Sequence, residues 1–224
     1  LGFDSAFYMA WRVRENVMDL LEYLTGNRVH YAMIQIGGVR RDIVPDQFPR
    51  IEESMKFFEE AYGKLAAVFL DDTTVQMRCR DCGVLTYDQA RELCPVGPTA
   101  RASGIKKDVR VDHPYAAYAD LDIDYITPDL LTGEVRGDVY DRIVTRLLEV
   151  RQSIDIVRQL LARMPDGPLL AIPKPAVLLA KLKGAAGEAV GRHDAPRGEV
   201  MHYVSLEAGR DEPVAWKVKA YYYS

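Results

Sequence analysis

The chain has 224 residues, of which 29 are Lys or Arg and 33 are Asp or Glu, so its formal net charge is −4. This balance lacks the basic excess of a nucleic-acid-binding protein and is typical of a soluble one. The sequence contains no run of about 18 apolar residues that could cross a membrane. The cysteines, Cys79, Cys82 and Cys94, are odd in number, which argues against a disulfide framework and favours a reducing compartment.

The first third of the chain predicts two long helices with a short strand between them. Apolar side chains recur at helical spacing over residues 5–24 and again over 49–72. Between these segments, hydrophobic and polar residues alternate, which predicts a short strand near 28–36, ended by Gly37 and Gly38. On this pattern alone His30 is better explained as a structural histidine than as a ligand.

Two short helices are predicted next, over residues 73–81 and 86–93. Thr86 and Gln89 have the spacing of a capping box, in which each side chain satisfies a free backbone amide of the other. Cys79 and Cys82 form a CxxC pair, but a zinc site needs four ligands and only Cys94 follows nearby. A helix, not a strand, precedes the pair, unlike in a thioredoxin-like motif. We therefore expect no metal or redox site at these thiols.

The stretch Gly97-Pro98-Thr99-Ala100-Arg101-Ala102-Ser103-Gly104 is too rich in Gly and Pro for a helix interior. Its position between helical segments is one where functional sites are commonly built. A surface loop with a solvated Arg101 explains the same residues equally well.

The second half predicts a long helix followed by a small β element. Residues 118–128 alternate in a way that suits a half-buried extended segment, and 138–164 hold the most regular helical stripe in the chain. Charged residues on that helix, Glu149 among them, are expected to form local ion pairs. A short helix near 176–183 and a hairpin of strands 198–206 and 213–220 follow.

These elements predict a mainly α, α+β fold with a helical bundle core. We expect a single domain over residues 1–224, with a helical core over 1–165 and an α+β part over 166–224. The missing initial Met and the end of the chain directly after a strand-like segment suggest a fragment of a longer protein.

Several motifs in order together resemble one superfamily, that of the large subunit of energy-converting, membrane-bound nickel-iron hydrogenases and the 49 kDa quinone-site subunit of respiratory complex I. Each motif is weak alone, but eight in order are specific. They are Trp11-Arg12-Val13-Arg14-Glu15, residues 25–30, Gly37-Gly38-Val39-Arg40-Arg41-Asp42, residues 83–86, residues 97–104 with 108–110, residues 114–118, residues 137–142 with 149–153, and Ala195-Pro196-Arg197-Gly198-Glu199. The sequences of residues 97–104 and 37–42 are more similar to the hydrogenase branch than to the complex I branch.

The resemblance implies site residues that tune a redox centre. In such relatives the histidine at the place of His30 lies close to a 4Fe-4S cluster on a partner subunit, where an imidazole couples its proton to the electron. Arg28 and Arg101 would lie near the same interface and raise the cluster potential. Ion pairing of Arg101 or Arg28 with Asp108 or Asp141 is the structural alternative. The remaining family positions, expected to form a charge network, are Arg40, Arg41, Asp42, Asp108, Arg110, Asp141, Arg142 and Glu199.

The resemblance also implies what this stretch lacks. Nickel-iron catalysis needs two CxxC pairs near the ends of the large subunit, and Cys79 and Cys82 fall mid-chain. We therefore expect no catalytic residue, no metal ligand and no cofactor in these residues. The parent would carry a nickel-iron centre or bind quinone, with the 4Fe-4S cluster on an iron-sulfur small subunit. It would be peripheral on the cytoplasmic side of the membrane, held by partner subunits.

Three hypotheses about the function of the whole protein stay open. The first is an oxidoreductase subunit of a hydrogenase whose electron transfer is coupled to proton or ion translocation, with the fragment inactive alone. The second is a non-catalytic hydrogenase-like scaffold or assembly subunit, and the third a complex I-type quinone reductase subunit. Apolar bundle surface exposed without neighbours would favour a homo-oligomer of the fragment.

Overall fold

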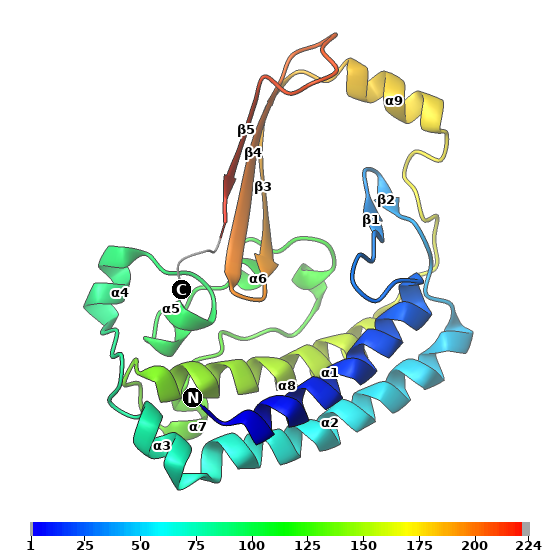
Figure 1. Ribbon diagram of the computed structural model, residues 1–224. Helices are drawn as coiled ribbons and strands as arrows, with labels where there is room; N and C mark the ends of the chain where they lie inside the picture. Colours follow the sequence, from blue (N-terminus) through cyan, green and yellow to red (C-terminus); the bar gives the residue numbers. More distant parts are fainter. Residues whose placement is uncertain (1, 221–224) are drawn as a thin grey trace.

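The computed structural model of the chain describes residues 2–220. Three long helices form its base: α1 (Asp4–Thr25), α2 (Phe48–Asp71) and α8 (Val139–Arg163) lie side by side, with α2 in contact with both others (Figure 1). Their apolar stripes meet in one core cluster of Leu20, Ile51, Met55, Phe58 and Ile154. The predicted helical bundle core is confirmed, and each helix begins and ends within two residues of its expected bounds.

Short helices connect the long ones on one side of this base. They are α3 (Thr73–Cys79), α4 (Tyr87–Leu93), α5 (Pro98–Ala102), α6 (Val109–Asp112) and α7 (Asp129–Thr132), with single 3-10 turns at Pro45–Gln47 and Tyr118–Asp120. The predicted extended segment over 118–128 is therefore a 3-10 turn followed by irregular chain, with no strand. Its backbone is held instead by side chains of α8, since Gln152 Nε2 donates to the Asp124 carbonyl at 3.0 Å.

The capping box predicted at Thr86 is present at the start of α4. The Gln89 backbone N–H donates to Thr86 Oγ1 at 3.3 Å, and the Thr86 N–H donates to Gln89 Oε1 at 3.1 Å. Thr86→Ala is expected to lower the free energy of unfolding by about 1 kcal/mol, because the cap is lost. Chemical denaturation measures the change, with Thr74→Ala, at an exposed position in α3, as the control that should change little.

The C-terminal part rises from this base as a three-stranded antiparallel sheet in the order β3 (Gly187–Ala195), β4 (Gly198–Leu206), β5 (Ala215–Lys219) (Figure 1). The β4–β5 hairpin was predicted; β3 was not. Strand β3 contains Gly187, Gly191 and several charged residues, so it has no alternating pattern, yet it pairs with β4 along its whole length. The mixed α+β class is confirmed.

The short strand predicted near 28–36 is present but spans only two residues. Only Ile34–Gln35 (β1) and Gly38–Val39 (β2) pair, in a two-residue ladder. Residues before it turn instead, because Asn27 Oδ1 accepts hydrogen bonds from the backbone N–H groups of Val29 and His30 at 2.8 and 3.0 Å. This small hairpin is joined to residues 169–171 by backbone hydrogen bonds between Val39 and Leu169 and between Ala171 and Gly37.

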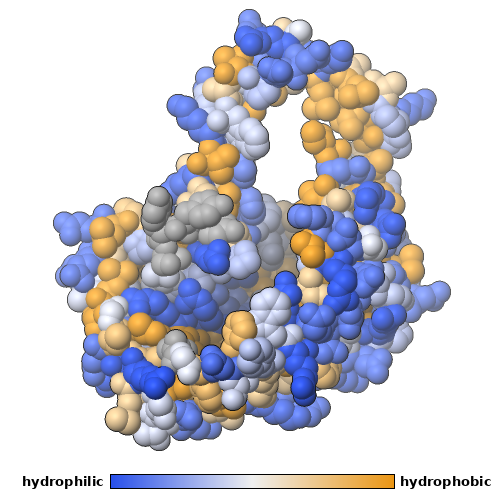
Figure 2. Space-filling model, viewed as in Figure 1, coloured by the Kyte–Doolittle hydropathy of each residue, from blue (hydrophilic) through white to orange (hydrophobic). Residues whose placement is uncertain are grey.

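Helix α9 (Pro175–Lys183) lies at the far end of the sheet and completes an arm that returns to β1 and β2 (Figure 1). Figure 2 shows an opening between this arm and the sheet. At its base the sheet is fixed by a close backbone approach: a Cβ on Gly97, whose φ is 67°, would lie 2.4 Å from the Arg197 carbonyl oxygen. Only glycine fits at that point, so the sheet and α5 are held in contact.

Candidate functional site

A buried ion network lies where α5, α6, α8 and the end of β3 meet, and Arg101 is at its centre. The Arg101 side chain is 2% exposed, with Nη1 3.1 Å from Asp108 Oδ2. Its Nε donates to Glu149 Oε1 at 2.9 Å, and Nη2 makes a further short contact with the same oxygen. Nη1 also donates to the Lys107 carbonyl at 3.0 Å. Arg101 is thus held by two carboxylates from two different elements.

Asp108 is shared between two guanidinium groups. Besides Arg101 it binds Arg110, whose Nε and Nη2 donate to its two carboxylate oxygens at 3.0 and 2.7 Å. Asp108 also caps α6, since its Oδ1 accepts the Arg110 backbone N–H. Burial opposes ionisation of Asp108, but the hydrogen bonds from Arg110 and the charge of Arg101 together lower its pKa. Burial alone would lower the pKa of Arg110, but the hydrogen bonds and charge of Asp108, with the charges of Asp194 and Glu149, raise it overall, so Arg110 stays charged.

Asp194, at the end of β3, is the third carboxylate of the network. Its Oδ2 lies 3.6 Å from Arg110 Nε, and its own backbone N–H donates to Tyr115 Oη at 2.9 Å. Burial raises the pKa of Asp194 to about 6, and the partial compensation by Arg110 does not cancel this effect. The network therefore joins the base of the sheet to the helices.

An open groove of about 710 Å³ runs beside the network between α1, α2 and α8. Apolar side chains such as Val17, Phe58 and Val157 line most of it, while Arg101, Glu149 and Asp194 line one end. Its volume lies in the range of about 300–1,000 Å³ typical of ligand pockets. Burial, followed by the neighbouring arginines, lowers the pKa of Arg146 in the same wall.

A second set of family residues holds the start of α8. Asp138 caps the helix by accepting the Asp141 N–H at 2.9 Å, and its other oxygen accepts the Asp81 N–H at 2.9 Å. Asp141 accepts the backbone N–H groups of Arg136 and Gly137 at 2.6 and 2.9 Å. Burial raises the pKa of Asp141, offset in part by these two bonds.

Arg142 extends this second set and donates to the Gly83 carbonyl at 2.6 Å. The set fixes loops to the helix, and Asp141 pairs with neither Arg28 nor Arg101.

Arg28 and His30 lie elsewhere, in the segment between the end of α1 and β1. In Figure 1 this end of α1 lies on the opposite side of the molecule from α5. Arg28 folds back on α1 and contacts Glu15 at 2.6 Å, Asp19 at 2.5 Å and Glu22 at 3.1 Å. The hydrogen bonds that Arg28 donates to Asp19 and Glu22 raise its pKa. The His30 side chain is exposed. The structure thus separates these two residues from Arg101, which the sequence had grouped with them.

The remaining predicted residues lie either near the turn after α1 or at the base of the three-stranded sheet. Arg40 Nη2 lies 3.4 Å from the carbonyl oxygens of Thr25 and Tyr31, so it ties the turn after α1 to β2. Arg41 approaches Gly26 in the same turn, and Asp42 Oδ1 accepts the Ile43 N–H at 2.9 Å. Glu199 belongs to the sheet base, with Arg192 at 3.4 Å and Lys107 at 3.7 Å.

Sequence reasoning missed two members of the network. Glu149 was expected in a local ion pair on α8, but it pairs with Arg101, 48 positions away. Asp194, which directly precedes Ala195, was not singled out as a site residue. Glu149 lies in one of the family motifs and Asp194 directly precedes another, but neither position indicated which charges meet. The possible solvated loop around Arg101 is excluded by its burial.

The thiols lack the arrangement of a metal centre. Cys79 is buried at the end of α3, where burial raises the pKa of its thiol, whereas Cys82 and Cys94 are exposed. Within residues 2–220 no group of three or more His, Cys, Asp or Glu side chains is placed to hold a metal ion. The donor set does not fit a nickel-iron centre, which needs two CxxC pairs.

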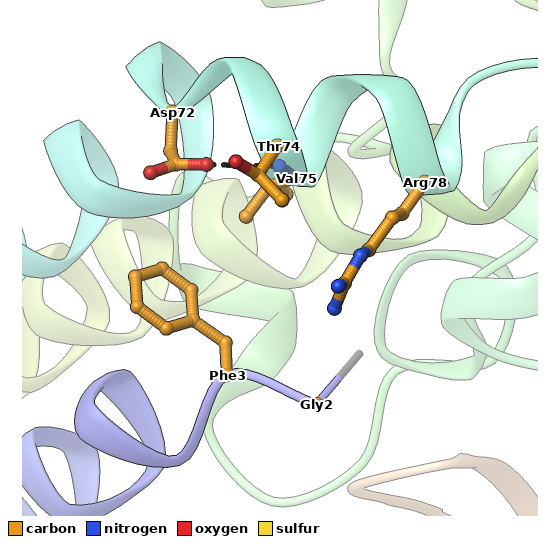
Figure 3. A pocket seen from close by; sticks show the side chains of 6 residues that line it. All are labelled: Gly2, Phe3, Asp72, Thr74, Val75 and Arg78. Carbon is orange, nitrogen blue, oxygen red and sulfur yellow. Dashed lines mark hydrogen bonds between the residues drawn. The ribbon is translucent and has the colours of Figure 1, made fainter.

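A smaller pocket of about 160 Å³ lies between the start of α1 and α3, lined by Gly2, Phe3, Asp72, Thr74, Val75 and Arg78 (Figure 3). Asp72 accepts the Val75 N–H at 2.9 Å and so caps α3. The pocket lies away from every predicted site residue and below the volume typical of ligand pockets. We assign it no function.

Comparison with known proteins matches all of residues 1–224 to the family described as respiratory-chain NADH dehydrogenase, 49 Kd subunit. The chain is 46% identical, over 97% of its length, to the membrane-bound hydrogenase subunit alpha of Pyrococcus furiosus, of which it covers 51%. It is 34% identical, over 95% of its length, to NADH-quinone oxidoreductase subunit 4 of Thermus thermophilus, of which it covers 52%. The carbon monoxide-induced hydrogenase of Rhodospirillum rubrum is 34% identical over 99% of the chain, which covers 58% of that protein.

The chain thus spans about half the length of the curated relatives it matches. These relatives are named as oxidoreductases or their subunits, hydrogenases among them. The resemblance drawn from the eight motifs is confirmed by the family match, which covers the whole chain. The chain belongs to the family of the 49 kDa subunit of respiratory-chain NADH dehydrogenase, which here includes membrane-bound hydrogenase subunits.

Proposed function

We propose that this chain forms part of the large subunit of a membrane-associated redox complex and meets, around His30, a 4Fe-4S cluster carried by a partner subunit. The observation that carries the proposal is the exposed imidazole of His30, held at the surface by the Asn27 turn. An exposed imidazole is free to donate a hydrogen bond to a sulfide of a docked cluster and to exchange a proton as the cluster changes charge.

Arg28 provides a cation two positions before this histidine, and three acidic side chains of α1 fix its guanidinium in place. Arg101 has a different role, because its side chain is only 2% exposed, against 37% for Arg28, and is held inside the protein by Asp108 and Glu149. We assign Arg101 to the support of the fold and keep Arg28 and His30 as the pair that faces the partner.

Among the three hypotheses about the whole protein, we favour the hydrogenase-type complex. The chain is 46% identical to a hydrogenase subunit and 34% identical to a quinone oxidoreductase subunit over similar lengths. The nickel-iron centre would then be held by residues outside this stretch, and the chain alone would be inactive. Within residues 2–220 no helix is long and apolar enough to span a membrane, so contact with the membrane would come through partner subunits on its cytoplasmic side.

The experiment is a redox titration of the cluster in the whole complex at several pH values, followed by electron paramagnetic resonance. With His30 intact, the potential should fall by up to about 59 mV per pH unit near neutrality, the value for one proton per electron. His30→Leu should flatten this slope. His113→Leu, at another exposed histidine, is the matched control and should keep the slope. An unchanged slope in His30→Leu would refute the proposal.

A further inference from the structure

Asp194 differs from the other carboxylates of the ion network in its hydrogen bonds. Its contact with a cation is the 3.6 Å separation between Oδ2 and Arg110 Nε, which is longer than a hydrogen bond. The N–H groups of Arg110 on that edge already donate to Asp108, at 3.0 and 2.7 Å. Asp194 therefore experiences the charge of Arg110 without receiving an N–H from it.

The carboxylates of the network differ in how closely the cations hold them. The guanidinium groups of Arg101 and Arg110 face the carboxylates of Asp108, Glu149 and Asp194. Asp108 is held by both cations and Glu149 by Arg101, with Arg146 nearby, so Asp194 is the carboxylate with the weakest cation contact. Its side chain is only 17% exposed, which leaves little water to stabilise its negative charge.

The groups that face Asp194 come from several elements. Asp108 and Glu149 oppose its ionisation, and Arg110 and Arg101 favour it. Tyr115 accepts the Asp194 backbone N–H, and burial raises the pKa of the neighbouring Tyr118, which keeps that phenol neutral.

Three further basic side chains lie near Asp194 in sequence. Arg192 contacts Glu199 at 3.4 Å, Arg197 has its own interaction, and His193 stacks on His202 with ring centroids 5.9 Å apart. Together these surroundings raise the pKa of Asp194 to about 6, with burial the largest cause.

Asp194 also has access to the groove. Together with Ala195 and Pro196 it lines the polar end of the space between α1, α2 and α8. A carboxyl group in this position can donate its O–H to an acceptor in the groove when protonated and accept a hydrogen bond when ionised. The other carboxylates of the network, Asp108 and Glu149, are paired with guanidinium groups whether Asp194 is protonated or ionised.

We propose that Asp194 is a proton-binding site that takes up and releases one proton at the polar end of this groove, exchanging it with solvent or with a molecule bound there. The proposal goes beyond the redox role of His30, and the two can fail separately because different residues on different sides of the molecule carry them.

The test is a pH titration by ¹³C NMR of the protein labelled with [4-¹³C]aspartate. One side-chain resonance should titrate with a midpoint near 6, and it should be missing in Asp194→Asn. Asp166→Asn, at an exposed position, is the matched control and should leave that resonance in place. If every aspartate titrates below about pH 5, near the ordinary value, the proposal is wrong.

A second variant keeps the test decisive if Asp194→Asn fails to fold. Glu149→Gln removes a negative charge that faces Asp194 and frees Arg101, so both effects should lower the midpoint of the Asp194 resonance by several tenths of a pH unit or more. Glu53→Gln, an exposed acid on α2, should not move it. A midpoint that stays fixed in Glu149→Gln would show that the network does not control this carboxyl and would overturn the proposal.

Discussion

Replacing Arg101 by methionine is expected to lower the free energy of unfolding by about 3–5 kcal/mol, the range for breaking a buried ion pair by removing one partner. Methionine fills most of the volume of the arginine stem, so the loss comes from charge. Asp108 and Glu149 would stay inside the protein, with Asp108 1% and Glu149 18% exposed, without the guanidinium that now holds them. Arg110 would still pair with Asp108, which leaves Glu149 as the main uncompensated carboxylate.

Urea denaturation of the purified protein measures this loss. Arg91→Met, at an exposed position on α4, is the matched control and should change stability by less than about 0.5 kcal/mol. The double variant Arg101→Met with Glu149→Gln separates charge from packing. If the ion pair carries the effect, Glu149→Gln should cost less in the Arg101→Met background than in the original protein. Additive losses, or a loss from Arg101→Met of under about 1 kcal/mol, would contradict the assignment.

The elements predicted correctly are those whose signal lies within a few residues. Helices α1, α2 and α8 carry regular apolar stripes that pack on one another, and the Thr86 capping box is a contact over three positions. The β4–β5 hairpin alternates along its own chain. Such patterns can be recognised in the sequence because helix periodicity and cap geometry depend on the local backbone alone.

Strand β3, which was missed, and the strand near 28–36, which was expected to be longer, depend on contacts that residue alternation does not record. Strand β3 forms because it pairs with β4 along all nine of its residues, although its own residues have little strand preference. The segment near 28–36 turns because a single side chain, that of Asn27, captures two backbone amides. Alternation alone could not distinguish this turn from a strand.

The candidate site was predictable as a set of residues but not as an arrangement. The motifs named Arg101, Asp108 and Arg110, and the structure brings these three together. The same reasoning grouped Arg101 with His30 and left out Glu149 as a partner. Charge pairing across 48 positions has no sequence period, so only the fold could decide which cation remains at the surface.

The second large effect is on the pH dependence of stability. Asp194 has a pKa of about 6 in the folded protein, against about 4 for an ordinary aspartate in the unfolded chain. Between these values the folded state binds more protons than the unfolded state, so stability from this group is present at low pH and lost as pH rises from about 4 to about 6. A difference of two pKa units corresponds to up to about 3 kcal/mol in the free energy of unfolding. Above pH 6 the ionised Asp194 destabilises the folded protein by this amount.

Asp194→Asn removes the titrating group and keeps its shape. We expect the variant to gain up to about 3 kcal/mol relative to the original protein as pH is raised from 4 to 7.5, because only the original protein then pays for an ionised carboxylate at this position. Urea denaturation at half-unit pH steps gives the difference curve, which should bend near pH 6. Asp166→Asn should give a curve without this bend. Parallel profiles for Asp194→Asn and the original protein would mean that Asp194 ionises at its ordinary pKa despite its burial, and that water or Arg110 compensates its charge fully.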